Sequence, residues 1–266
     1  MERKELLQIL HTRFARSIYT PFLRAIREFD LVQPGDRVAV CISGGKDSAL
    51  LALLLDDYAG RGGFEVRFLA MDPGYPAENR RQIVENMAQF GLDLVMFETN
   101  VLQIAGKHAP KHPCFLCAKL RRGNLYAQAQ ALGCNKIALG HHYDDAIETV
   151  LMGLLYGGQV QAMLPRLAAA NYPGMELIRP LYFTREQAVS EWVEACGLTF
   201  LPCACPAAQR QENTKRAEIK ALIADLAARN PQIEANILNA VKNVDTKKIL
   251  GWRDGDGFHS FLDSFS

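Results

Sequence analysis

One short stretch limits the fold more than any other part of the chain. Residues 37–55 read RVAVCISGGKDSALLALLL, an apolar run with β-branched residues, two adjacent glycines and a strongly apolar segment. This order predicts a strand, a tight loop and a helix. Adjacent glycines let a backbone come close to a ligand, and the first N–H groups of a helix attract anions. We therefore expect a phosphate-type ligand at this loop.

The same strand and helix pattern recurs along the chain. Residues 64–72, 92–99 and 135–142 read as strands, and residues 76–91 read as a helix between the first two of them. Strands that alternate with helices build an open parallel sheet with helices on both faces, as in Rossmann-like proteins. We therefore predict an α/β fold of this type.

Three polar segments follow predicted strands. They are Ser43-Gly44-Gly45, Asp72 and Gly140-His141-His142. Ligands of open parallel sheets bind beyond the carboxyl ends of the strands. The sequence thus predicts that these three segments meet at one crevice.

Helical patterns flank the predicted sheet. Apolar residues at helical spacing in residues 3–29 are interrupted at Pro21, which predicts one kinked helix or two. Near the other end the predicted helices cover residues 184–197, 213–230 and 231–244, and Pro231 suits a first helical turn. The final DGDGFHSFLDSFS is expected to be a loosely docked tail. The expected domains are an N-terminal helical segment at 1–32, an α/β domain at 33–200 and a cysteine-containing helical region at 201–266.

Composition narrows the class of protein without identifying a partner. The 266 residues are 49% hydrophobic and 22% charged, with a formal net charge of +1, which neither favours nor excludes nucleic acid. The N-terminus has no signal-peptide pattern, and no apolar run approaches the ~18 residues of a membrane span. We therefore expect a cytoplasmic protein without a membrane partner, in which the seven cysteines are thiols, redox groups or metal ligands.

The glycine loop carries groups suited to phosphate. Ser43 and Ser48 offer hydroxyl donors and Lys46 offers a positive charge, but the order SGGKDS departs from the Walker A pattern. The alternative is a plain strand-to-helix turn in which Asp47 caps the helix. That alternative requires neither the lysine nor both serines.

A second motif, GHHYDDAIETVLM, occupies residues 140–152. Asp145 and Glu148 have capping-box spacing, so one interpretation is a well-capped helix without chemistry. That interpretation leaves Gly140, His141 and Asp144 unexplained. Two carboxylates beside a triphosphate would also make a plausible Mg²⁺ site.

Four cysteines form two short patterns. Cys114 and Cys117 form C-x-x-C, while Cys203 and Cys205 lie two apart in LPCACP. Four thiols could close a zinc site or hold an iron–sulfur cluster. Cys41, Cys134 and Cys196 lie in apolar surroundings and are expected to be buried thiols.

The motifs together resemble those of a known family. SGGKDS resembles the SGGxDS signature of the PP-loop ATPases, which split ATP between its α and β phosphates. With PCFLCAKLRRG, GHHYDDAIET and the late cysteines, residues 35–210 closely resemble the tRNA 2-thiocytidine synthetase (TtcA) family. By this resemblance, the expected ATP-binding residues are Ser43, Gly44, Gly45, Lys46, Asp47, Ser48, Asp72, Gly140 and His141. The expected catalytic or Mg²⁺-binding residues are Asp47, Asp144 and Asp145, and which of the last two acts stays open.

In that family three cysteines hold a [4Fe–4S] cluster that carries the sulfur to be transferred. Cys114 and Cys117 match the family's C-x-x-C directly. The third ligand is less clear, because the family has P-C-x-x-C where this chain has P-C-A-C. Cys203 is favoured over Cys205, and the open iron would be lost if both bound.

The resemblance implies an ATP-dependent sulfur transferase that acts on a tRNA pyrimidine, most simply cytidine, with a sulfide or persulfide donor and a homodimeric assembly. Basic side chains that could contact tRNA phosphates, or be solvated helix faces, are Arg121, Arg122, Lys215, Arg216, Lys220, Lys242, Lys247 and Lys248. Two rivals remain: a PP-loop ligase that uses an amine, and a cluster-binding sensor whose ATP site regulates without catalysis.

Overall fold

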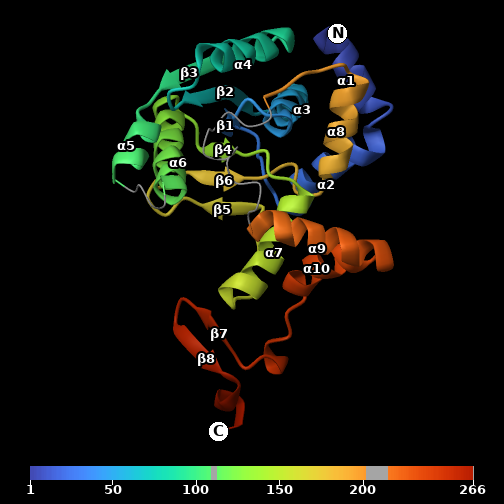
Figure 1. Cartoon of the computed structure of the whole chain (residues 1–266), viewed down its shortest axis with the longest axis vertical. Helices are drawn as coiled ribbons and strands as arrows, with labels where there is room; N and C mark the ends of the chain where they lie inside the picture. The colour runs from blue at the N-terminus through green and yellow to red at the C-terminus, as the bar shows by residue number, and fades with distance from the viewer. Residues whose placement is uncertain (109–112, 202–214, 266) are drawn as a thin grey trace. The chain divides into compact units, whose positions relative to one another are not determined.

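A computed structural model describes residues 1–108, 113–201 and 215–265, with the side chains of 113–115, 264 and 265 outside the description. The chain divides into two compact units, Met1–Ala146 with Leu164–Asn213, and Ile147–Met163 with Thr214–Ser266. Figure 1 shows the elements of each unit. No helix among the described residues has the length and apolar character needed to cross a membrane.

The first unit contains a mostly parallel sheet. Its order among the described residues is β3-β2-β1-β4-β6-β5. The strands are β1 Arg37–Ile42, β2 Glu65–Asp72, β3 Leu94–Glu98, β4 Lys136–Ala138, β5 Arg166–Ala168 and β6 Glu176–Ile178. All neighbours pair in parallel except β5, which runs antiparallel to β6 at one edge. The predicted parallel α/β sheet is thus confirmed, whereas β5 and β6 were not predicted, because three-residue strands carry little periodic signal.

Helices cover both faces of this sheet. Ala39 and Cys41 of β1 pack in a cluster with Tyr126, which lies in the helix α6 Pro113–Ala131. Val38 and Val40 alternate with them, are fully buried and point to the opposite face, where the helix α3 Lys46–Gly62 packs on β1. The helices of this unit's sheet are α3 Lys46–Gly62, α4 Ala77–Gln89, α5 Val101–His108, α6 Pro113–Ala131 and α8 Glu186–Ala195.

The N-terminal segment belongs to the same compact unit as the sheet. It forms α1 Arg3–His11, a π-helical turn η1 Ala15–Tyr19 and α2 Thr20–Glu28. The predicted interruption is present, but the α-helical pattern stops after His11, and Pro21 lies in the first turn of α2. Proline is tolerated there because the first N–H groups of a helix have no partner within the helix.

A charged cluster joins three strands at the end of the sheet opposite the predicted crevice. The buried Lys136 ammonium lies 2.9 Å from Asp36 and 3.2 Å from Glu176. Burial opposes ionisation of Asp36, but hydrogen bonds from Lys136 and Asn135 outweigh it and lower the pKa of its carboxyl group. Burial likewise opposes ionisation of Glu176, and hydrogen bonds from Arg166 and Lys136 lower its pKa. This cluster is therefore a structural anchor.

The second unit begins inside α7 Tyr143–Gly157 and continues with α9 Lys215–Arg229, α10 Ile233–Lys242, η2 Thr246–Lys248, β7 Gly251–Asp254, β8 Gly257–Ser260 and η3 Phe261–Phe265. Pro231 precedes α10 instead of starting it.

The expected tail has more structure than the sequence suggested, because β7 and β8 form an antiparallel hairpin with Trp252 opposite His259. The rings of these two residues stack with centroids 5.1 Å apart. The repeated Asp-Gly pairs are typical of a tight hairpin turn, a signal that the tail interpretation overlooked.

Candidate functional site

The glycine loop lies between β1 and α3. Gly44 has a φ of +88°, and a Cβ there would lie 2.9 Å from Cγ1 of Ile83. Both the left-handed backbone and the close approach favour glycine. Gly45 caps α3, so Asp47 lies inside the first turn and is not the cap that the plain-turn alternative required. The loop therefore turns its backbone sharply at the N-terminus of a long helix.

The two serines of the loop bind each other. The Ser43 N–H donates to Oγ of Ser48 at 3.1 Å, and the two hydroxyl oxygens are 3.1 Å apart. The buried Ser48 hydroxyl also donates to the Gly45 carbonyl at 2.9 Å. Ser48 thus closes the loop from the α3 side and Ser43 stays exposed.

Lys46 contacts two carboxylates. Its Nζ lies 3.1 and 3.2 Å from the two oxygens of Asp47, and 3.4 Å from Oε1 of Glu186. Glu186 is the first residue of α8, distant in sequence. Sequence reasoning missed it, because Glu186 lies inside the helix predicted at residues 184–197 and belongs to neither motif.

The second motif lies directly against the first. Gly140 follows β4, and a Cβ there would lie 3.0 Å from the Asp47 carbonyl carbon and 3.0 Å from the Ser48 nitrogen. Two backbone segments therefore pass each other so closely that any side chain at position 140 would crowd the α3 backbone.

The capping of α7 differs from the arrangement that the alternative without chemistry required. His142 precedes the helix, and the Asp145 carboxylate accepts its N–H at 3.0 Å. This is capping-box geometry three residues earlier than the Asp145–Glu148 pair whose spacing that alternative used. Glu148 instead pairs with Arg216 at 3.6 Å, within the second unit.

Asp144 and Asp145 face different neighbours. The Asp144 carboxylate accepts the Glu186 N–H at 2.7 Å and lies 3.2 Å from Nη2 of Arg185. It therefore binds the first turn of α8, whereas Asp145 lines a cavity beside the glycine loop.

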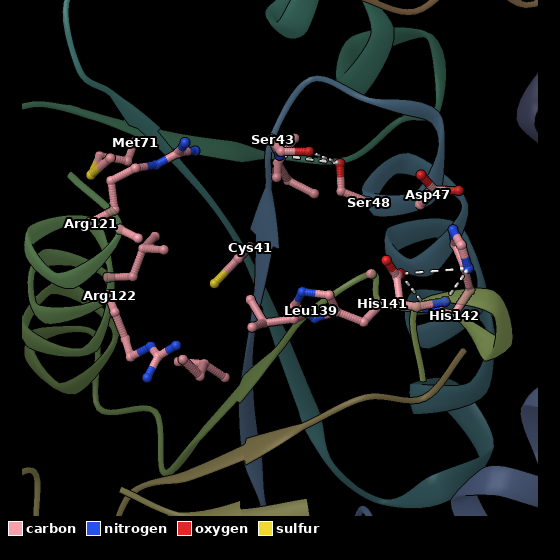
Figure 2. A pocket seen from close by; sticks show the side chains of 16 residues that line it. Cys41, Ser43, Asp47, Ser48, Met71, Arg121, Arg122, Leu139, His141 and His142 are labelled. Atoms are coloured by element: carbon pink, nitrogen blue, oxygen red, sulfur yellow. Dashed lines mark hydrogen bonds and ion pairs between the residues drawn. The ribbon is translucent and has the colours of Figure 1, made fainter. Parts of the chain in front are cut away.

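That cavity has a volume of about 470 Å³ and is open on one side. Figure 2 shows Asp47, Ser48 and His142 on one side of it, with Arg121 and Arg122 of α6 opposite. It is lined by Cys41, Ile42, Ser43, Asp47, Ser48, Met71, Ala118, Arg121, Arg122, Leu125, Ile137, Leu139, Gly140, His141, His142 and Asp145. Charged and hydroxyl-bearing side chains line it together with apolar ones such as Leu125, Ile137 and Leu139, so the cavity suits a ligand with charged and planar parts.

Asp72 ends β2, next to Met71, but its carboxylate is engaged locally. It accepts the N–H groups of Gly74 at 2.9 Å and Tyr75 at 2.7 Å, and Arg80 lies 3.5 Å from it. The structure therefore brings the glycine loop and the Gly140 segment together at the cavity, while the Asp72 side chain holds its own turn.

Two further groups near the cavity have shifted pKa values. Burial, and then the neighbouring Cys134, raise the pKa of the Cys41 thiol to about 12. Burial, and then the charge of Arg122, lower the pKa of Arg179 to about 10. Arg179 directly follows β6, and sequence reasoning missed it.

The cysteine patterns are only partly described. Cys117 of α6 is buried in a cluster with Met71, Val101 and Ala105. Cys114 lies in the first turn of α6, but its side chain is outside the described set. Cys203 and Cys205 lie outside the described residues altogether. Within the described part of the chain, no three His, Cys, Asp or Glu side chains are grouped to hold a metal ion.

Comparison with known proteins agrees with the arrangement of the two motifs. The model of a family described as a PP-loop domain matches residues 13–224, most of the chain. The chain belongs to the PP-loop family.

Relatives of this PP-loop protein match over nearly its whole length. A tRNA-cytidine(32) 2-sulfurtransferase of Syntrophotalea carbinolica is 37% identical, over 92% of this chain and 95% of the relative. The protein of the same name from Legionella pneumophila (strain Paris) is 34% identical, over 85% and 81%. The resemblance to the tRNA 2-thiocytidine synthetase family is thus confirmed, and the chain is a sulfurtransferase of this family.

A solved structure shares the fold. The U34-tRNA thiolase NcsA from Methanococcus maripaludis, determined with its [4Fe-4S] cluster, superposes with a TM-score of 0.67. It is 20% identical in sequence, and the match covers 85% of this chain and 80% of that one. At this identity the likeness supports the PP-loop fold alone.

Proposed function

We propose that this PP-loop sulfurtransferase converts a tRNA cytidine to 2-thiocytidine at the expense of ATP, in the cytoplasm. The observation that carries the proposal is the single cavity where the SGGKDS loop and the GHHYDD motif meet. Relatives that span 92% of the chain and carry the name tRNA-cytidine(32) 2-sulfurtransferase support the choice of substrate.

The loop fits the phosphates of ATP. Adjacent glycines, the N-terminus of α3, Lys46 and the exposed Ser43 offer N–H groups, a positive charge and a hydroxyl to the same region. In this proposal they bind the pyrophosphate portion, with Gly140 and His141 bordering the same ligand. Asp72 would act through the backbone turn that it fixes.

The proposed reaction has two steps. The carbonyl oxygen at C2 of the cytosine attacks the α-phosphorus of ATP, and the bond to the β-phosphate breaks with release of pyrophosphate. A sulfur nucleophile then attacks C2, and AMP leaves with the former carbonyl oxygen. Adenylylation is needed because the unmodified oxygen is a poor leaving group.

Acidic residues near the loop are proposed to assist the first step. Asp47 and Asp145 line the cavity and are candidates for Mg²⁺ binding or substrate activation. Asp144 is engaged with the first turn of α8, so we assign it a supporting role. The guanidinium groups of Arg121 and Arg122 face the same cavity and could neutralise the tRNA or ATP phosphates.

A [4Fe–4S] cluster would supply the transferred sulfur when bound. Cys114 and Cys117 belong to α6, the helix that lines the cavity with Ala118, and a C-x-x-C on that helix has the thiol chemistry for a cluster. Cys203, or else Cys205, is the proposed third ligand. The sulfide or persulfide donor and a homodimer also remain proposals.

The test is an anaerobic reconstitution. Protein with analysed iron and sulfide is incubated with ATP, Mg²⁺, a sulfur donor and unmodified tRNA, and the tRNA nucleosides are identified by mass spectrometry. The proposal predicts 2-thiocytidine that requires ATP and is lost in Cys114→Ala. Stoichiometric zinc without iron would reject the cluster, and tRNA-independent ATP binding without pyrophosphate release would favour the sensor.

A further inference from the structure

The first turn of α8 reaches the phosphate loop from a distant part of the sequence. The Oε1 atom of Glu186 lies 3.4 Å from Nζ of Lys46, and the two residues are 140 positions apart. Their side chains are 31% and 25% exposed, so the pair is partly shielded from water. The contact between Glu186 and Lys46 therefore depends on the position of the first turn of α8 relative to the glycine loop.

The second motif holds α8 in this position. The Asp144 carboxylate accepts the backbone N–H of Glu186 at 2.7 Å and pairs with Arg185 at 3.2 Å. Arg185 also lies over the Tyr143 ring, 4.9 Å from its centroid. Tyr143 and Asp144, which begin α7, therefore hold the start of α8 and with it Glu186, the residue that contacts Lys46.

A lysine side chain is flexible, and ordering it costs conformational entropy. A partner that orders it before ATP arrives reduces the cost of binding. Lys46 has three N–H donors, so it can hold a phosphate oxygen as well as the Asp47 and Glu186 carboxylates that it contacts here. Protein kinases use the same logic, with a glutamate on a separate helix paired to the phosphate-binding lysine.

We infer that Glu186 is a positioning residue that holds Lys46 ready for the ATP phosphates. Asp144 controls this contact by fixing the start of α8, so that the two motifs act as one unit. The inference rests on the ATP binding of the proposed function, but not on the identity of the tRNA base.

The chain offers a clean substitution. Glu186→Gln removes the charge but keeps the size of the side chain, and it leaves the backbone N–H that Asp144 accepts. Glu194→Gln changes the same residue type at an exposed position of the same helix. A purely structural glutamate in a first helical turn would stabilise α8 through the helix dipole, whatever residue stands at position 46.

The experiment measures the affinity of the full-length protein for Mg·ATP by calorimetry, without tRNA. Glu186→Gln is expected to weaken binding about two- to fivefold, the range of a partly exposed ion pair. Glu194→Gln should bind like the wild type. In a Lys46→Ala background, Glu186→Gln should add no further loss, because the effect passes through Lys46.

Unchanged affinity in Glu186→Gln, or the same loss with and without Lys46, would overturn the inference. Melting temperatures measured in parallel separate a folding defect from lost positioning, and Glu186→Asp, which restores the charge on a shorter side chain, should recover part of the affinity. A wild type that binds ATP with this coupling yet forms no 2-thiocytidine would reject the proposed function and leave the inference standing.

Discussion

Gly140 lies against the backbone of Asp47. A Cβ at position 140 would stand 3.0 Å from the Asp47 carbonyl carbon, so close that the backbone of Asp47 would have to shift to accommodate it. The strand end of the second motif and the first turn of α3 are therefore packed backbone to backbone. This contact fixes the distance between the two motifs at the cavity.

Gly140→Ala should consequently separate the motifs. We expect destabilisation of about 1–3 kcal/mol from overpacking, and a loss of about 100-fold in the thiolation rate from misplaced groups. Denaturant unfolding and a single-turnover assay measure the two effects. Gly60→Ala is the matched control, since open space surrounds that position in α3. Wild-type activity in Gly140→Ala would contradict the close packing.

Asp144 and Asp145 should respond differently to alanine substitution. Asp144→Ala leaves the Glu186 N–H and Arg185 without this acceptor, which should cost about 1–3 kcal/mol of unfolding free energy. Asp145→Ala should reduce ATP-dependent activity about 100-fold, because its carboxylate lines the cavity, while losing its cap on the His142 N–H should cost only about 1 kcal/mol of stability. Unfolding free energy and the rate of pyrophosphate release are measured for both variants. If the two variants lost stability and activity in the same proportion, separate roles for Asp144 and Asp145 would be excluded.

Lys136→Met should destabilise the sheet strongly. The substitution leaves Asp36 and Glu176 without the ammonium that lies 2.9 and 3.2 Å from them. Breaking a buried pair by removing one partner costs about 3–5 kcal/mol. Urea unfolding at neutral pH measures this loss. The cavity is at the opposite end of the strands, so the affinity of the folded variant for ATP should stay near that of the wild type.

The same cluster predicts the response to acid. The pKa values of Asp36 and Glu176 are lowered in the folded protein, so their contribution is fully present above the unfolded values near about pH 4. It is lost as the pH falls through the folded values. Unfolding free energy measured from pH 6 downward should therefore drop below about pH 4 in the wild type. A Lys136→Met protein that shows an equally steep drop would exclude this origin.

Cys41 should resist alkylation in the folded protein. Burial, with Cys134 next to it, raises its pKa to about 12, so almost none is thiolate at neutral pH although the residue lines the cavity. Peptide mapping after iodoacetamide treatment should find Cys41 labelled only on unfolding. Rapid labelling of the native protein would show that the thiol is more accessible than its burial implies.

The sequence alone determined the α/β fold, the phosphate loop and the family, because these depend on local patterns. The order SGGKDS between an apolar strand and an apolar helix needs no tertiary information to be recognised. The chain's family resemblance, including its cysteine patterns, was likewise visible in consecutive residues. By contrast, the Asp-Gly pairs at residues 254–257 are a local signal for a turn, and the sequence interpretation did not use them to predict the hairpin of β7 and β8.

Only the tertiary structure decided which distant residues act together. Glu186 begins α8 and Arg179 follows β6, and neither belongs to a motif. The contact of Glu186 with Lys46 and the burial of Arg179 appear only in the folded chain. The sequence also could not tell which neighbours Asp144 and Asp145 contact. Adjacent acidic residues at a helix start look alike in sequence, but their side chains point in different directions. Direction and long-range contact arise from packing, which periodicity does not encode.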